Sequence, residues 1–142
     1  MARSSRPRKP YRPKPIGRPV LDAMRRDLMV PVYAMLTALA ESDDAELLRN
    51  AWHQLVATLS YMRRVCASRA AEADIAAGEA ALEAVYDRHE RTGKWRCTGP
   101  ELVTLRRAVA ACDWELPYLR TDQITAGLLD VFRRLGPVRA AA

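Results

Sequence analysis

The residues with the clearest chemical character are the cations of the first nineteen positions. Residues 1–19 of this 142-residue chain contain seven basic residues and no acidic one: Arg3, Arg6, Arg8, Lys9, Arg12, Lys14 and Arg18. The whole chain has 23 Lys and Arg against 17 Asp and Glu, so beyond residue 19 the remaining 16 basic residues face all 17 acidic ones. A concentration of positive charge of this kind suits phosphate groups.

Residues 1–19, called the arm below, are also rich in proline. Each proline fixes the backbone angle φ and removes a hydrogen-bond donor, which excludes an α-helix and predicts an extended segment. Pro7, Pro10 and Pro13 recur every third residue, the turn length of a polyproline II helix. An extended basic ribbon can follow a nucleic-acid backbone, and the ring of Tyr11 can stack on an exposed base.

Two other interpretations of the arm stay open. A basic tail of this size can be a solubilising segment without a specific partner. Residues 7–12 also fit the P-x-x-P-x-R pattern of a proline-rich ligand, which Pro- and Arg-rich stretches also produce by chance. We expect DNA or RNA as the partner of the arm, with a protein partner as the alternative.

A second candidate contact lies in residues 93–97. Trp95 stands between Lys94 and Arg96, and an aromatic ring between two cations can stack on a base. The opposite interpretation is that Trp95 packs over the core. The segment lacks the upstream glycine and the following Ser or Thr of a phosphate-binding loop, so nucleotide hydrolysis is not predicted.

No set of residues predicts an enzyme. Cys66, Cys97 and Cys112 lack C-x-x-C spacing, and their odd number does not suit a disulfide framework. No local spacing orients His53 and His89 as metal ligands. We therefore expect no catalytic residue, no metal site and no cofactor.

The composition predicts a helical, cytosolic chain. Alanine is abundant, β-branched residues are sparse and there is one Phe, which favours helices over sheets. No apolar run approaches the roughly 18 residues that a membrane span needs, and the basic start leads into prolines instead of a signal-peptide apolar region. We expect no membrane contact.

The apolar residues that must position these candidates follow the period of α-helices. A first helix is predicted over residues 19–39, with Pro19 as its first residue, and with a kink near residues 27–30 or a division into two short helices because Pro31 interrupts it. A second helix follows a cap at Ser42 or Asp43. Its apolar stripe suits the core or a homodimer interface and consists of Leu48, Trp52, Leu55, Leu59, Met62 and Cys66.

Three further helices are predicted downstream. The sequence does not decide whether the chain turns between residues 67 and 73. A third helix contains Gly78, typical of a close helix crossing, and ends at residues 92–93, where glycine suits a left-handed conformation. A capping box at residues 98–101 starts a fourth helix, whose last turn Pro117 disrupts. The last helix starts at residue 121 or 122 and ends near residue 135.

These segments predict an all-α fold: a compact bundle of four or five mostly antiparallel helices with an extended Pro/Arg-rich N-terminal arm. The domains are the arm at residues 1–19, the helical bundle at residues 20–137 and a tail at residues 138–142. The aromatic segment at residues 114–119 adds a candidate surface for a protein partner.

Three segments of the sequence are similar in composition to segments of a known group of proteins. They are residues 8–15, residues 92–99 and residues 119–126, which read RKPYRPKP, TGKWRCTG and LRTDQITA. With its Ala-rich helical remainder, the chain resembles small basic helical proteins encoded by temperate phages and prophages of proteobacteria. The resemblance implies a phage or mobile-element context and a bacterial cytoplasm, and it assigns no functional residue.

We therefore expect a non-enzymatic nucleic-acid-binding accessory or regulatory protein of a phage or mobile element. Its arm contacts phosphates, Lys94, Trp95 and Arg96 add a second contact, and a homodimer is compatible with the apolar pattern. The alternative is a phage-encoded protein-interaction module that binds and modulates a host protein.

Overall fold

The computed structural model describes the backbone of residues 18–120 and the side chains of residues 22–120. Its elements are α1 (Arg18–Glu41), α2 (Ala45–Val65), α3 (Arg69–Thr92), α4 (Gly99–Glu115) and the short 3-10 helix η1 (Leu116–Tyr118). Residues 1–17 of the arm, the predicted last helix and the tail lie outside the described residues.

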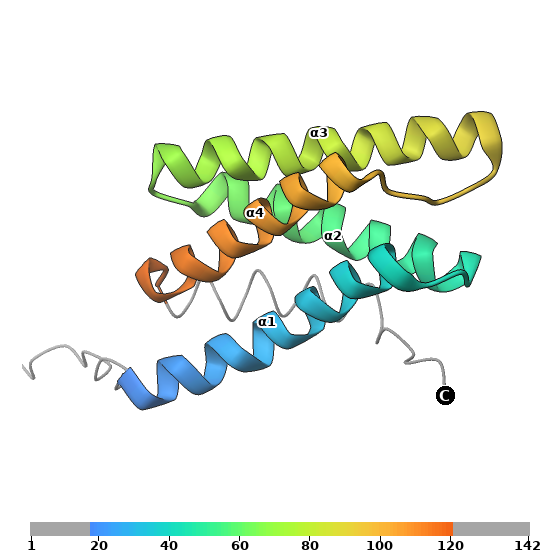
Figure 1. Ribbon diagram of the computed structural model, residues 1–142. Coiled ribbons are helices and arrows are strands. Elements are labelled where there is room, and N and C mark those ends of the chain that lie inside the picture. The colour runs from blue at the N-terminus through green and yellow to red at the C-terminus, as the bar shows by residue number, and fades with distance from the viewer. Residues whose placement is uncertain (1–17, 121–142) are drawn as a thin grey trace, which may run out of the picture.

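Successive helices run antiparallel and form a four-helix bundle (Figure 1). Helices α1 and α3 each pack against both α2 and α4, so that neighbours in sequence are also neighbours in space. The connections span residues 42–44, 66–68 and 93–98, too short for a crossover. The predicted all-α bundle is confirmed for the described residues, and none of their helices is long and apolar enough to cross a membrane.

The core consists of the apolar stripes of the four helices. On α2 the side chains of Leu48, Leu55, Leu59 and Met62 are each at most 5% exposed. These four side chains of the predicted stripe therefore pack inside one chain, whereas Trp52 and Cys66, its other two members, are partly exposed. The burial of the four gives no support to the predicted homodimer.

Helix α1 is continuous through Pro31, so the predicted alternative of two short helices is wrong. The proline removes one backbone hydrogen bond. Leu28, Val32 and Met35 on both sides of it are buried in the same core. Their burial holds the two halves of the helix on one face and offsets the missing bond.

The ends of the helices follow local side-chain chemistry. The cap of α2 is Asp44, not the predicted Ser42 or Asp43, and its carboxylate accepts hydrogen bonds from the backbone of residues 46 and 47 at 3.0 and 3.2 Å. The chain turns at residues 66–68, and Ser68 caps α3. The predicted left-handed Gly93, with φ of 71°, and the capping box at residues 98–101 are confirmed. The α-helix α4 ends at Glu115, and Pro117, predicted to disrupt the last turn of this helix, lies in the 3-10 helix η1.

Helices α3 and α4 cross closely at Gly78, as predicted. A Cβ atom added to Gly78 would lie 2.4 Å from Cβ of Ala108 and 3.1 Å from Cδ1 of Leu59. Since Leu59 belongs to α2, three helices meet at this position, and a side chain at residue 78 would push them apart.

We predict that Gly78→Ala destabilises the bundle. Overpacking of a close-packed core costs typically 1–3 kcal/mol, which outweighs the gain of about 1 kcal/mol in helix propensity. Urea unfolding followed by circular dichroism measures the change. Gly99→Ala is the matched control, because a Cβ at that helical glycine meets no atom within 4 Å. Equal unfolding midpoints for the two variants would contradict the close crossing.

Candidate functional site

The three residues of the predicted loop contact, Lys94, Trp95 and Arg96, differ in their exposure to solvent. Trp95 is buried, with 6% of its surface exposed, and its ring stacks on His89 with centroids 3.8 Å apart. Its ring also lies 5.4 Å from that of Trp52 on α2. The core-packing interpretation of Trp95 is therefore correct, and its predicted base-stacking role is wrong because the ring lies inside the bundle.

Lys94 and Arg96, on either side of Trp95, are exposed. One guanidinium nitrogen of Arg96 lies 3.6 Å from a carboxylate oxygen of Asp43 in the connection between α1 and α2. Such an exposed pair contributes little stability. The side chains of Lys94 and Arg96 therefore remain accessible to an anionic partner.

Hydrogen bonds from Arg88 of α3 hold the connection at residues 93–98 against the start of α4. The guanidinium of Arg88 donates two hydrogen bonds to the carboxylate of Glu101, at 2.5 and 3.0 Å, and one to the carbonyl oxygen of Arg96 at 2.6 Å. The same carboxylate accepts the backbone N–H of Thr98 at 2.8 Å in the capping box. The hydrogen bonds from Arg88, helped by those from Thr98, lower the pKa of Glu101 below its ordinary value.

We predict that the stability supplied by Glu101 depends on pH. Because folding lowers its pKa, the ionised carboxylate stabilises the fold above about pH 4.5, the ordinary value, and this stability is lost as the pH falls through the lower folded value. Glu101→Gln keeps a capping-box residue but removes the charge. The variant should melt below the unchanged protein at pH 7 and approach it in acid.

Thermal unfolding between pH 2.5 and pH 7 measures this difference. Glu46→Gln in the first turn of α2 is the control, since this exposed carboxylate has no arginine bound to it in the described residues. If the difference in melting temperature between the Glu101→Gln variant and the unchanged protein stays constant across the pH range, the lowered pKa of Glu101 is contradicted.

Arginines of the bundle bond to carboxylates of the bundle. Arg25 of α1 pairs with Asp113 of α4 at 2.5 Å, and Arg63 of α2 pairs with Glu79 of α3 at 2.7 Å. With the Arg88 pair, these contacts join three pairs of adjacent helices. They neutralise three of the arginines of the bundle with its own carboxylates.

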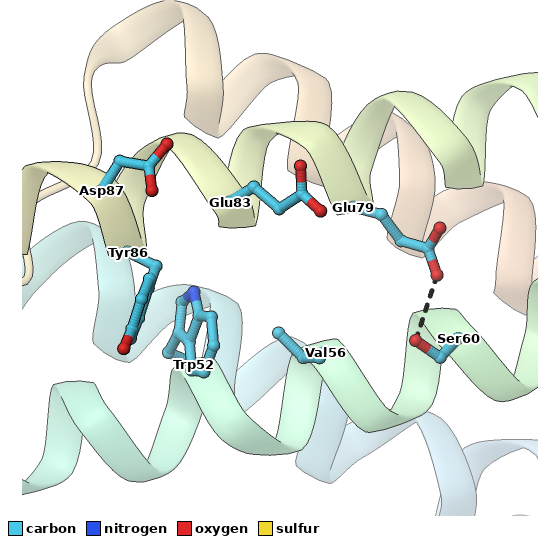
Figure 2. A pocket seen from close by; sticks show the side chains of 7 residues that line it. All are labelled: Trp52, Val56, Ser60, Glu79, Glu83, Tyr86 and Asp87. Atoms are coloured by element: carbon cyan, nitrogen blue, oxygen red, sulfur yellow. Dashed lines mark hydrogen bonds between the residues drawn. The ribbon is translucent and has the colours of Figure 1, made fainter.

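A groove of about 590 Å³ lies between α2 and α3 (Figure 2). Two aromatic rings form one end: Trp52 and Tyr86, with centroids 5.2 Å apart and planes 28° from parallel. The indole N–H of Trp52 donates to the carbonyl oxygen of Leu82 at 2.8 Å, which fixes its ring, whereas Tyr86 is 41% exposed. At the other end the hydroxyl of Ser60 donates to Glu79 at 3.1 Å.

Three carboxylates line the α3 side of this groove. Glu79, Glu83 and Asp87 recur every fourth residue, so they lie on one stripe of the helix (Figure 2). Arg63 and Ser60 bind Glu79, whereas the carboxylates of Glu83 and Asp87 make no hydrogen bond or ion pair within residues 22–120. The groove thus joins an apolar aromatic end to unneutralised negative charge.

Sequence reasoning missed this groove, although one signal for it exists. Acidic residues near the start of a helix are explained by the helix dipole. The acids at residues 79, 83 and 87 lie in the middle and last part of α3, where the dipole does not favour them. Three mid-helix acids at a spacing of four therefore indicate an acidic surface that the dipole does not explain.

The cysteine side chains are not activated as nucleophiles. Burial raises the pKa of Cys112 to about 12 and that of Cys97 to about 11, and it also raises the pKa of Cys66. The thiolate is the reactive form, so these shifts disfavour attack at neutral pH. In the part of the chain that the structure describes, no three His, Cys, Asp or Glu side chains gather as metal ligands.

The basic residues predicted in the arm lie outside the described side chains. They are Arg3, Arg6, Arg8, Lys9, Arg12, Lys14 and Arg18, together with Tyr11. Of these, only the backbone of Arg18 is described, as the first residue of α1.

Comparison with known proteins gives no relative. No family model, curated protein or solved structure matches this chain. The resemblance to phage proteins therefore stays a prediction.

Proposed function

We propose that this chain is a non-enzymatic nucleic-acid-binding accessory or regulatory protein of a phage or mobile element. The arm contacts the phosphates of DNA or RNA, and the helical bundle holds the arm in place. A bacterial cytoplasm is part of the same proposal.

The observation that supports this proposal most is that the excess positive charge of the chain lies in the arm. Outside the arm, basic and acidic residues nearly balance, and the bundle forms the pairs Arg25–Asp113, Arg63–Glu79 and Arg88–Glu101. The arm has no acid of its own to neutralise its cations. Phosphate groups are the partner that such a segment attracts over the longest distance.

Each side chain has a distinct part in this proposal. The arginines and lysines of the arm bind phosphate oxygens without reading sequence, and Tyr11 stacks on an unpaired base. Lys94 and Arg96 add charge from the connection between α3 and α4. Trp95 supports that connection from inside the core and takes no part in binding.

We predict that nucleic-acid binding depends steeply on salt and requires the charge of the arm. Seven phosphate contacts give a slope of log K against log salt concentration of roughly −6 on duplex DNA and roughly −5 on single strands. Fluorescence anisotropy with both kinds of DNA over a salt series measures the slope. Deleting residues 1–17 should remove nearly all of it and leave the helical content unchanged.

Two charge variants make this experiment specific. The first replaces the six basic residues of positions 1–17 by glutamine. The second removes the same charge from six exposed arginines of the bundle: Arg26, Arg49, Arg69, Arg91, Arg106 and Arg107. Only the first should abolish binding. Equal losses in both variants, or an unchanged slope without the arm, would overturn the role of the arm.

The alternative, a phage-encoded module that binds and modulates a host protein, is favoured by a different observation. Trp114 and Tyr118, at the end of α4 and in η1, are 68% and 70% exposed. Large exposed aromatic side chains are enriched where proteins bind one another. Under this alternative, Trp114→Ala with Tyr118→Ala abolishes capture of one defined host protein, while neutralising the arm leaves capture intact.

A further inference from the structure

We propose that the α2–α3 groove is a binding site for the chain's own arm, with residues 6–14 as its occupant. The inference goes beyond nucleic-acid binding, because the contact would form in the absence of any nucleic acid. It rests on the shape and charge of the groove and on the order of residues in the arm.

The chemistry of the groove matches a basic, proline-rich segment. Extended proline-rich ligands dock on aromatic rings, which accept the flat proline ring at little entropic cost because the ligand is already extended. Trp52 and Tyr86 provide such a pair of rings. Glu83 and Asp87 provide the negative charge that selects a basic ligand over a neutral one.

The order of residues in the arm supplies two matching edges. With three residues per turn, Pro7, Pro10 and Pro13 share one edge of a polyproline II helix. Arg6, Lys9 and Arg12 share a second edge, and all three are basic. When the proline edge faces the two rings, the basic edge can therefore run along the acidic stripe of α3.

The spacing of the charges is compatible. Successive basic residues on that edge are about 9 Å apart, at about 3.1 Å per residue. Glu83 and Asp87 are separated by about 6 Å along α3, at 1.5 Å per residue. The difference of about 3 Å is within the reach of the flexible side chains of lysine and arginine.

The groove has an energetic reason to bind cations. Like charges four residues apart destabilise a helix by a few tenths of a kcal/mol, and the stripe has two such neighbouring pairs. Arg63 relieves the charge only at Glu79. The largest concentration of unneutralised cations in the sequence is the arm.

The arm leads directly into α1, and residues 15–17 link the proposed occupant to its first residue, Arg18. The start of α1 lies at the same end of the bundle as the end of α2, one of the two helices that form the groove (Figure 1). Because the arm is covalently attached, even weak contacts form at a high effective concentration. An arm held in the groove would have its basic edge neutralised, so under the proposed function nucleic acid would compete with the groove for the arm.

Photo-cross-linking of the full-length protein, without nucleic acid, tests the inference. Pro7, on the edge that faces the two rings, is replaced by p-benzoylphenylalanine, and cross-linked peptides are identified by mass spectrometry at low protein concentration. We expect cross-links within one chain to residues 52–60 and 79–87. Cross-links to another face, to residues 121–142 or between two chains would overturn it.

Charge-reversed variants make the test quantitative. Glu83→Arg with Asp87→Arg should reduce the groove cross-links roughly fivefold, as expected for the loss of two exposed ion pairs. Asp27→Arg with Asp74→Arg makes the same change in net charge on exposed residues outside the groove and should leave the cross-links unchanged. Equal losses in the two variants would overturn the proposal, since they would indicate unspecific attraction.

A charge swap completes the experiment. Lys9→Glu with Arg12→Glu should lose the cross-links in the unchanged bundle and regain them with Glu83→Arg and Asp87→Arg. Circular dichroism confirms that each variant is folded. The salt series measures nucleic-acid binding, whereas cross-linking measures binding of the arm to the groove. Either the proposed function or this inference can therefore fail while the other stands.

Discussion

The close approach of α3 to α4 at Gly78 is the constraint on which the rest of the bundle depends. The Cβ of Ala108 occupies the space that a side chain at residue 78 would need, and Leu59 of α2 fills the space beside it. This contact sets how α3 lies on both of its neighbours. The register of α3 against α2, which forms the groove, and its register against α4, which forms the Arg88–Glu101 pair, therefore both follow from one small residue.

Local chemistry made several features predictable from the sequence. The capping box at residues 98–101 and the left-handed Gly93 depend only on residues a few positions apart, and both occur as expected. The cap of α2 was misplaced because Asp43 and Asp44 have the same side chain, and the choice between them depends on how the connection is folded. The predicted division of α1 at Pro31 is wrong, because the local cost of the proline is offset by distant core contacts.

The site was harder to predict, since it depends on contacts between helices. Trp95 lies beside two cations in the sequence, yet its burial is decided by His89 of α3 and Trp52 of α2. The groove needs Tyr86 opposite Trp52 and Glu79 opposite Ser60, a register that no pattern within one helix encodes. The concentration of positive charge in the arm, by contrast, could be predicted by counting the basic and acidic residues of the sequence.

Trp52 connects the two surfaces that are candidates for binding. Its ring contacts exposed Tyr86 in the groove and buried Trp95 under the connection that holds Lys94 and Arg96. Its indole N–H is fixed by α3 through the carbonyl oxygen of Leu82. The groove and the basic connection therefore share one aromatic cluster, and the packing of Trp52 supports both surfaces.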